Sequence, residues 1–310
     1  MKEHLRNPYL PPTASLQDEI EPLFVQGTLI PRGNAWPAWR GVRWCITAWR
    51  LFAVQPGGWL LMLLMYVGVS VLPWLLVLFL QDALPMVVPL FMQIVLLLLL
   101  TGGVVLASEN LGRYGTLDLR LLFSGPWRCR GKQLGFGVRY AGRVLLLLFG
   151  FAVFMLLFGR FFFPRAALVD PSVVLTTPLG LLLCLALFTA GAVYSCQAFL
   201  FGQALVMLHG LSPGDALFCA RSGSWRNIKP GLTAVFLVIA PAIFLGTLIF
   251  YEASDLLAYL ASMSPLLAGV AKLLSACLVA LISIPILALV FTSAHVAYRE
   301  IFLEAEKVRN

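Results

Sequence analysis

Charged side chains are scarce in this sequence. Asp, Glu, Lys and Arg make up 12% of its 310 residues, which is about half of the share found in soluble domains. This scarcity excludes an ordinary soluble enzyme, and the high apolar content excludes a disordered chain. Hydrophobic residues make up 60% of the chain, and its mean hydropathy is +0.91. We therefore expect most of the polypeptide to lie in a lipid bilayer.

Residues that carry metal or nucleophilic chemistry are also few. The chain has three histidines, and no two of its six cysteines have the spacing of two to four positions that zinc sites use. The run from Gly125 to Lys132 is one residue too long for a phosphate loop, and Gln133 replaces the required Ser or Thr. We expect no enzyme activity, no cofactor and no metal site. We also expect no disulfide, because the cysteines lie in apolar runs or in segments on the reducing side.

Long apolar runs define the predicted fold. Each of six runs has the roughly 20 residues that a helix needs to cross the hydrocarbon core. They are residues 57–80, 84–107, 141–163, 179–208, 231–251 and 265–294. The predicted fold class is all-α, a polytopic membrane helix bundle of about six transmembrane helices. We expect residues 1–36 to form a leader with a short helix over 15–27, and residues 37–310 to form the six-span membrane domain.

The distribution of positive charge predicts the orientation. The net charge of +8 comes from 22 Lys and Arg against 14 Asp and Glu, and all of the 22 except Arg160, Arg165 and Lys272 fall on one side of the predicted spans. Basic residues accumulate on the cytoplasmic side, so we expect both termini there. The same residues attract anionic lipid headgroups, which makes the bilayer surface the expected partner. Because they form no separate soluble module, we expect no nucleic-acid partner.

Amphipathic segments precede the first, third and fifth spans. They are residues 37–55, a segment that begins near Thr116 and Asp118, and a segment whose start has Ser212 as N-cap and Asp215 in the first turn. Trp and Arg favour the headgroup region, so we expect three interfacial helices, each followed by a transmembrane hairpin. The residues expected at the lipid interface are Arg40, Arg43, Trp44, Trp49, Arg50, Trp127, Arg128, Trp225 and Arg226.

The segment that enters the first span is rich in Trp, with Gly41, Trp44, Trp49, Leu51, Phe52, Pro56 and Trp59. Over this segment the chain resembles an uncharacterised family of bacterial multi-pass inner-membrane proteins, which opens with a Trp-rich, Leu-Phe, Pro segment before six or so spans. Val42, where another aromatic residue is expected, and the long leader before Ile30 depart from that pattern. The resemblance implies a location in the bacterial cytoplasmic membrane and no particular activity.

Two functions remain open at this point. The favoured one is a non-enzymatic scaffold or accessory factor of the cell envelope. The alternative is a permease-like or lipid-handling protein with a cleft near the fourth and sixth spans, where Gln197, Gln203 and Lys272 would be the polar contacts. Glutamine in a span bonds a neighbouring helix more often than it lines a cavity, and a Lys near a span end can extend to the interface. His209 and His295 stand near helix ends, where we expect structural roles.

Overall fold

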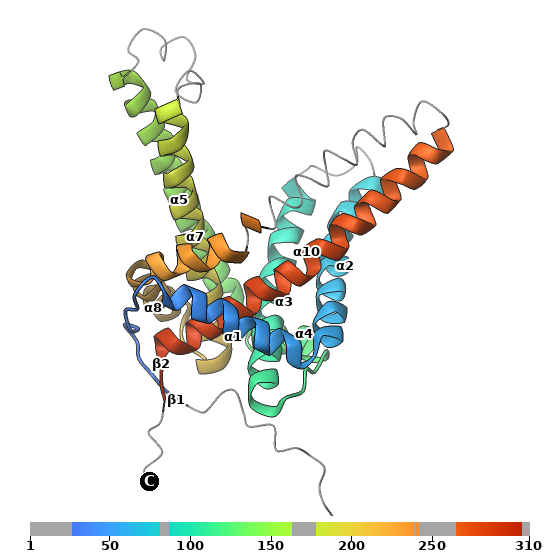
Figure 1. Cartoon of the computed structure of the whole chain (residues 1–310), viewed down its shortest axis with the longest axis horizontal. Helices are drawn as coiled ribbons and strands as arrows, with labels where there is room; N and C mark the ends of the chain where they lie inside the picture. Colours follow the sequence, from blue (N-terminus) through green and yellow to red (C-terminus); the bar gives the residue numbers. More distant parts are fainter. Residues whose placement is uncertain (1–26, 81–86, 163–177, 239, 242–264, 306–310) are drawn as a thin grey trace, which may run out of the picture.

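The computed structural model describes residues 27–80, 87–162, 178–238, 240–241 and 265–305. They fold as an all-α helical membrane bundle, which confirms the predicted fold class (Figure 1). The helices are α1 (Arg40–Val54), α2 (Pro56–Leu80), α3 (Val87–Tyr114), α4 (Leu121–Arg128), α5 (Arg130–Phe162), α7 (Pro178–His209), α8 (Pro213–Arg226), the helix Ile228–Val238, and α10 (Pro265–Phe302). Two short strands, β1 (Gly27–Leu29) and β2 (Leu303–Ala305), form an antiparallel pair.

Five helices in the described part of the chain are long and apolar enough to cross a membrane, namely α2, α3, α5, α7 and α10. They coincide with the first four and the last of the predicted spans. The fifth predicted span begins inside the helix Ile228–Val238, and its residues 242–251 lie outside the described residues. Helices α3, α5 and α10 continue past the predicted span limits, because helical hydrogen bonding does not end where an apolar run ends.

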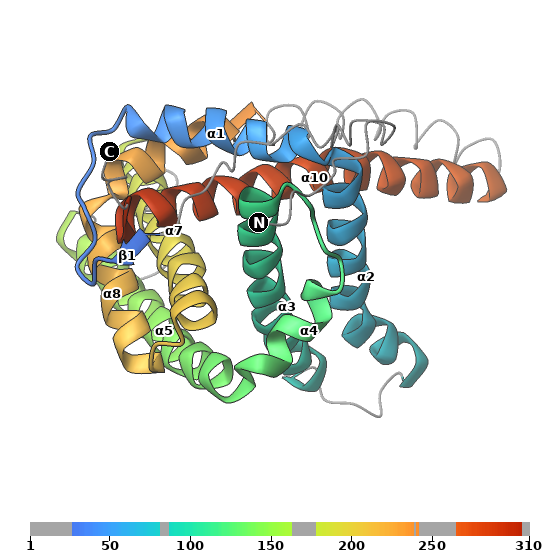
Figure 2. The same cartoon turned by 90° about the horizontal axis from the view of Figure 1, so that it is seen from below.

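The helices follow one repeated packing relation. Each of the three short helices packs along one long helix: α4 on α3, α8 on α7, and α1 on α10 (Figure 2). These three long helices, α3, α7 and α10, also contact one another. The contact of α1 with α10 therefore joins the first described helix to the last.

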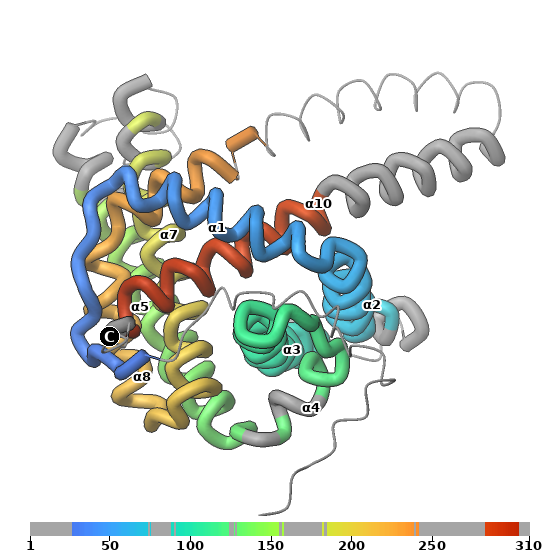
Figure 3. The backbone as a smooth tube through the Cα atoms, turned by 60° about the horizontal axis from the view of Figure 1, so that its bottom comes forward, coloured from blue at the N-terminus to red at the C-terminus, as the bar shows by residue number. Residues whose placement is uncertain are grey.

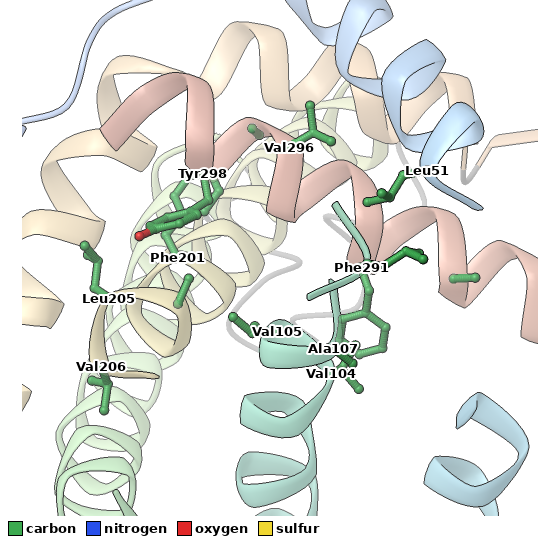
Figure 4. Packing of buried hydrophobic residues seen from close by; sticks show 14 of the residues in the cluster. Leu51, Val104, Val105, Ala107, Phe201, Leu205, Val206, Phe291, Val296 and Tyr298 are labelled. Carbon is green, nitrogen blue, oxygen red and sulfur yellow. The ribbon is translucent and has the colours of Figure 1, made fainter. Parts of the chain in front are cut away.

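The core of the bundle lies where α3, α7 and α10 converge. Figure 4 shows Phe291 of α10 beside Val104 of α3, and Tyr298 of α10 beside Phe201 of α7; all four are buried. Gly103 allows α4 to approach α3 closely, because a Cβ at that position would lie 2.4 Å from the carbonyl oxygen of Leu122. Close packing of this kind gives dispersion contacts that support helix association even where both surroundings are apolar.

One hairpin projects from this body. The ends of α5 and α7 that are joined to each other expose large apolar side chains on both helices, as the pair rises away from the rest of the bundle in Figure 1. The exposed residues include Leu145, Leu146, Phe149, Leu185 and Phe188. Contiguous apolar surface of this extent is unfavourable in water and is typical of helices that face lipid.

The basic connections lie at the same end of the bundle. Lys132, at the start of α5, donates to the carbonyl oxygen of Gly210 after α7 at 2.6 Å. The backbone nitrogen of Leu117, between α3 and α4, donates to Gln55 Oε1 between α1 and α2 at 2.8 Å. These contacts bring together connecting segments that the charge pattern placed on one side of the predicted spans.

The N-terminal segment is fixed to the end of α10 (Figure 3). Residues 27–36, the last part of the expected leader, begin with β1, which pairs with β2. Trp36 Nε1 then donates to the carbonyl oxygen of Glu300 at 3.1 Å. The short helix expected over 15–27 falls, up to residue 26, outside the described residues.

The predicted helix starts have different outcomes. Ser212 Oγ accepts from the backbone nitrogen of Asp215 at 3.3 Å, which confirms the predicted N-cap of α8. The start predicted near Thr116 and Asp118 is wrong, because α4 begins at Leu121. Asp118 Oδ1 instead accepts from the backbone nitrogen two residues later, in a turn that precedes the helix.

Candidate functional site

A buried ionic cluster lies where α3 and α10 meet. Glu109 of α3 is 6% exposed. Its Oε1 accepts hydrogen bonds at 2.5 Å from Arg113 Nε on the next turn of α3 and from Arg299 Nη1 of α10. Its Oε2 lies 3.0 Å from Nε2 of His295, one turn before Arg299. We call Glu109, Arg113, His295 and Arg299 the Glu109 cluster.

A second polar pair extends this junction to α7. His209 Nε2, at the end of α7, lies 2.6 Å from the hydroxyl of Tyr298 on α10. Tyr298 is fully buried, and the centre of its ring lies 5.9 Å from that of His295 in the Glu109 cluster. Each of the three central helices therefore contributes polar side chains to the same junction. Through these contacts each histidine joins its own helix to a neighbouring one.

Packing around the Glu109 cluster leaves almost no free space. The cavity between the three central helices has a volume of about 10 Å³, and its lining includes Ser108, Ala204 and Tyr298. A volume of this size holds one water molecule at most. Isolated buried charges are strongly unfavourable, so the Arg and His partners of Glu109 are needed for its burial.

The chemistry open to this cluster is limited by its own hydrogen bonds. Both oxygens of Glu109 already face Arg113, His295 and Arg299, so the carboxylate is not available as a general base for a substrate. Among the described residues, no group of three His, Cys, Asp or Glu side chains is placed to hold a metal ion. The arrangement is suited to holding helices in register.

A second acidic residue, Glu300, fastens α1 to α10. Its Oε2 accepts from Trp44 Nε1 at 3.0 Å and from Arg40 Nη1 at 3.3 Å, and Arg43 lies 3.8 Å from its Oε1. The Arg40 guanidinium also stacks 4.2 Å from the ring centre of Trp36. We call Glu300, Arg40, Arg43 and Trp44 the Glu300 cluster. It holds one face of α1 against α10.

Two of the residues expected at the lipid interface, Trp44 and Arg40, are instead packed inside the protein. Trp44 is 1% exposed and lies inside the protein, which corrects our expectation that it faces lipid. Arg40 is largely buried against Glu300 and Trp36. The pattern was misleading because a helix with Trp on several faces can bury one Trp and expose another.

The other expected interface residues lie mainly on the surface. Trp49 of α1 is 58% exposed, and Trp127 of α4 and Trp225 of α8 are each 71% exposed. We call these three the Trp collar, because one stands on each of the three short helices. The arginines Arg43, Arg50 and Arg226 are also exposed, whereas the side chain of Arg128 lies outside the described residues.

The two glutamines expected to line a cleft are not brought together. Gln203 is buried and accepts from Gln133 Nε2 of α5 at 3.1 Å. Gln197 packs against Gly231, in the helix that begins at Ile228. The side chain of Lys272 lies outside the described residues. The two glutamines therefore contact different neighbouring helices.

Sequence reasoning missed both acidic clusters. Glu109 and Glu300 each stand near the end of a long apolar helix, with Arg113 or Arg299 close by in sequence. A carboxylate at such a place signals a buried ion pair, because an unpaired charge there is strongly disfavoured. The partners on other helices could not be identified, since they are as far as 260 residues away.

Comparison with known proteins completes this description. No protein-family model, no curated protein and no solved structure matches this chain.

Proposed function

We propose that this chain is a non-enzymatic scaffold or accessory factor of the bacterial cell envelope. The observation that carries the proposal is the filled junction of α3, α7 and α10 beneath three exposed Trp-bearing helices. A scaffold needs rigid helices and accessible outer faces, and it needs no internal passage. The Glu109 cluster holds the helices rigidly, and the Trp collar provides the accessible outer faces.

The proposed setting is the bacterial cytoplasmic membrane, with both termini in the cytoplasm. Five helices with the length and composition of membrane spans support a multi-pass membrane protein. The excess of Lys and Arg in the connections at one end of the bundle supports a cytoplasmic position for that end. The bacterial location is supported by the resemblance over residues 41–59.

Transport is disfavoured by the same geometry. Carriers bind substrate in a cavity between their helical repeats, near the middle of the membrane. The cavity at the junction of the three central helices has a volume of about 10 Å³, which is far below the roughly 300 Å³ of a small-molecule site. The buried charges of the Glu109 cluster also resist separation of α3 from α10.

Cross-linking in living cells tests the scaffold function. A photoreactive amino acid at Trp49, Trp127 or Trp225 is expected to give discrete cross-linked products of protein size. The matched control is Leu146, which is 70% exposed on the projecting hairpin and is expected to give lipid adducts only. Absence of a protein product at all three positions of the Trp collar contradicts the proposal.

Reconstitution into vesicles tests the alternative. Purified protein is expected to leave the rates of lipid scrambling and solute leakage at those of protein-free vesicles. Lipid movement that requires the protein and disappears in a Gln197→Ala, Lys272→Ala variant with unchanged thermal unfolding would establish a permease-like or lipid-handling function. A Ser195→Ala variant is the control for substitution within α7.

A further inference from the structure

A larger hollow lies on the outer side of the bundle between α7 and α8. It has a volume of about 400 Å³ and is lined by Tyr194 of α7 and by Phe218, Arg221, Ser222, Trp225 and Arg226 of α8. We call it the α7–α8 groove. We propose that this groove binds the headgroup of an anionic phospholipid. The inference goes beyond the scaffold function, because it requires a membrane setting and no protein partner.

The groove forms because α8 folds back along α7. Gly210 has a positive φ of 62° and reverses the chain directly after α7. The α8 residues Ala216 and Ala220 are then buried, whereas Phe218, Arg221 and Trp225 remain exposed. These three share one side of the helix because their spacings of three and four match its turn. The outward side of α8 therefore carries a basic residue, Arg221, between two aromatic residues, Phe218 and Trp225.

Aromatic rings form the walls of the groove. The ring of Tyr194 meets the ring of Trp225 edge to face, with centres 6.2 Å apart. Phe218 is 62% exposed and stands two turns before Trp225 on α8. Tyr and Trp prefer the headgroup level of a bilayer, because their rings are apolar and their polar atoms favour water.

The charge of the groove is complementary to a phosphate group. None of its six lining residues is acidic, and two are arginine. Arg226 donates from Nη1 to the carbonyl oxygen of Gly33 at 3.2 Å, which fixes its position at the rim. Arg221 is exposed and has no hydrogen bond or ion pair with any residue that the structure describes. Its guanidinium group is therefore free to bind a phosphate through two hydrogen bonds.

The position of the groove favours a lipid over a soluble phosphate ester. Tyr140 of α5 donates to the carbonyl oxygen of Ser195 at 2.9 Å, beside Tyr194. Beyond this contact, α5 and α7 expose apolar residues such as Leu145 and Phe188. Tyr194 therefore stands where the projecting hairpin changes from packed to lipid-facing surface. A bound lipid could place its phosphate on Arg221 and its acyl chains along the apolar hairpin.

Native mass spectrometry of the full chain in a neutral detergent tests the proposal. The probes are dioleoylphosphatidylglycerol, dioleoylphosphatidylcholine and glycerol 3-phosphate. We expect the protein to bind the anionic lipid at least about tenfold more tightly than the zwitterionic lipid, the usual gain from a charged hydrogen bond. Arg221→Gln is expected to remove about tenfold of this affinity. Arg120→Gln, the same charge change at the exposed residue before α4, is the matched control and is expected to change the affinity less than about twofold.

Three results would overturn the proposal. Equal binding of the two lipids would show that the groove does not recognise negative charge. Equal losses in Arg221→Gln and Arg120→Gln would show diffuse attraction between the protein and anionic lipid. Competition by glycerol 3-phosphate at the concentration of the lipid would show a soluble phosphate ester as the ligand. Because Arg221 is exposed, unchanged thermal unfolding of its variant is expected and separates lost binding from lost folding.

Discussion

Trp44 donates a hydrogen bond from its indole nitrogen to Glu300 Oε2 at 3.0 Å, although the two residues are 256 positions apart. This contact joins the first described helix to the last. It depends on burial of the indole ring, which is 1% exposed. The first helix is thus anchored to protein on one face, and another face, which carries Trp49, is exposed.

Truncation of Trp44 is expected to destabilise the protein strongly. Trp44→Ala removes a buried ring and the hydrogen bond to Glu300, and we expect a loss of about 3–5 kcal/mol in the free energy of unfolding. Trp49→Ala, on the exposed side of the same helix, is expected to change it by less than about 0.5 kcal/mol. Unfolding by denaturant in detergent measures both. Similar losses in the two variants would contradict the placement of Trp44 inside the protein.

The Glu109 cluster predicts a second effect on stability. Glu109→Gln removes the negative charge that faces the Arg299 guanidinium group, and we expect a loss of about 3–5 kcal/mol in the free energy of unfolding. Asp118→Asn, at an exposed turn, is the control and should be near neutral. Combining Glu109→Gln with Arg299→Gln should cost less than the sum of the single changes, because the two residues interact directly. Additive losses would show that the pair is not coupled.

Two glycines are predicted to respond to alanine in opposite ways. Gly103→Ala would place a Cβ 2.4 Å from the carbonyl oxygen of Leu122, so we expect a loss of about 1–3 kcal/mol as α4 is displaced from α3. Gly142, in α5, has no atom within 4 Å of such a Cβ, so Gly142→Ala should be neutral or stabilising by up to about 1 kcal/mol. Shifts of the thermal midpoint in detergent measure the difference. A neutral Gly103→Ala would contradict the close packing of α3 and α4.

Two cysteines outside the spans predict a pH dependence of alkylation. Burial raises the pKa of the Cys45 thiol, and burial with the negative charge of Asp215 raises the pKa of Cys219. Fewer thiolates are present at a given pH when the pKa is higher, so iodoacetamide should react more slowly in the folded protein than after denaturation in SDS. The pH of half-maximal reaction at each peptide should also be higher when the protein is folded.

The raised pKa values of the two thiols also predict how the stability of the protein depends on pH. The folded state holds the two thiol protons to higher pH than the unfolded state, so this contribution is present below the ordinary thiol pKa and declines as pH rises above it. Denaturant unfolding at increasing alkaline pH checks the direction. A Cys45→Ser, Cys219→Ser variant is the control and should show a weaker decline. Equal declines in the two proteins would contradict the assignment to these thiols.

Accessibility of introduced cysteines tests the proposed orientation. A membrane-impermeant maleimide added to intact cells should label a variant with Cys in place of Asp170, which lies between the third and fourth predicted spans. It should label Gly131→Cys, at the exposed start of α5, only after the membrane is opened. A cysteine-free background keeps the two signals separate. The reverse pattern would place the basic connections outside the cytoplasm.

Much of the fold follows from local properties of the chain. The limits of α2 and α7 agree closely with the apolar runs that predicted them, because a helix in hydrocarbon needs a continuous apolar segment. The start of α8 also follows from Ser212 and its neighbours, since an N-cap satisfies backbone groups within one turn. The start of α4 does not follow from the local sequence, because the Asp118 side chain bonds within a turn that precedes the helix.

The clusters depend on the tertiary structure. The sequence shows that His209 and His295 stand near helix ends. It does not show that they contact Tyr298 and Glu109, or that Trp44 contacts Glu300. Such pairs require helices from distant parts of the chain to converge at the same depth, and no local rule encodes that convergence.

The sequence by itself determined that this protein has long apolar helices, basic connections at one end and aromatic residues in front of the first, third and fifth apolar runs. These properties arise from composition and periodicity, which act within a few turns of chain. Only the tertiary structure decided which charged and aromatic side chains are buried as partners and which stay on the surface. The reason is that burial of an acid such as Glu109 becomes favourable only when partners from a second helix are brought within hydrogen-bond distance.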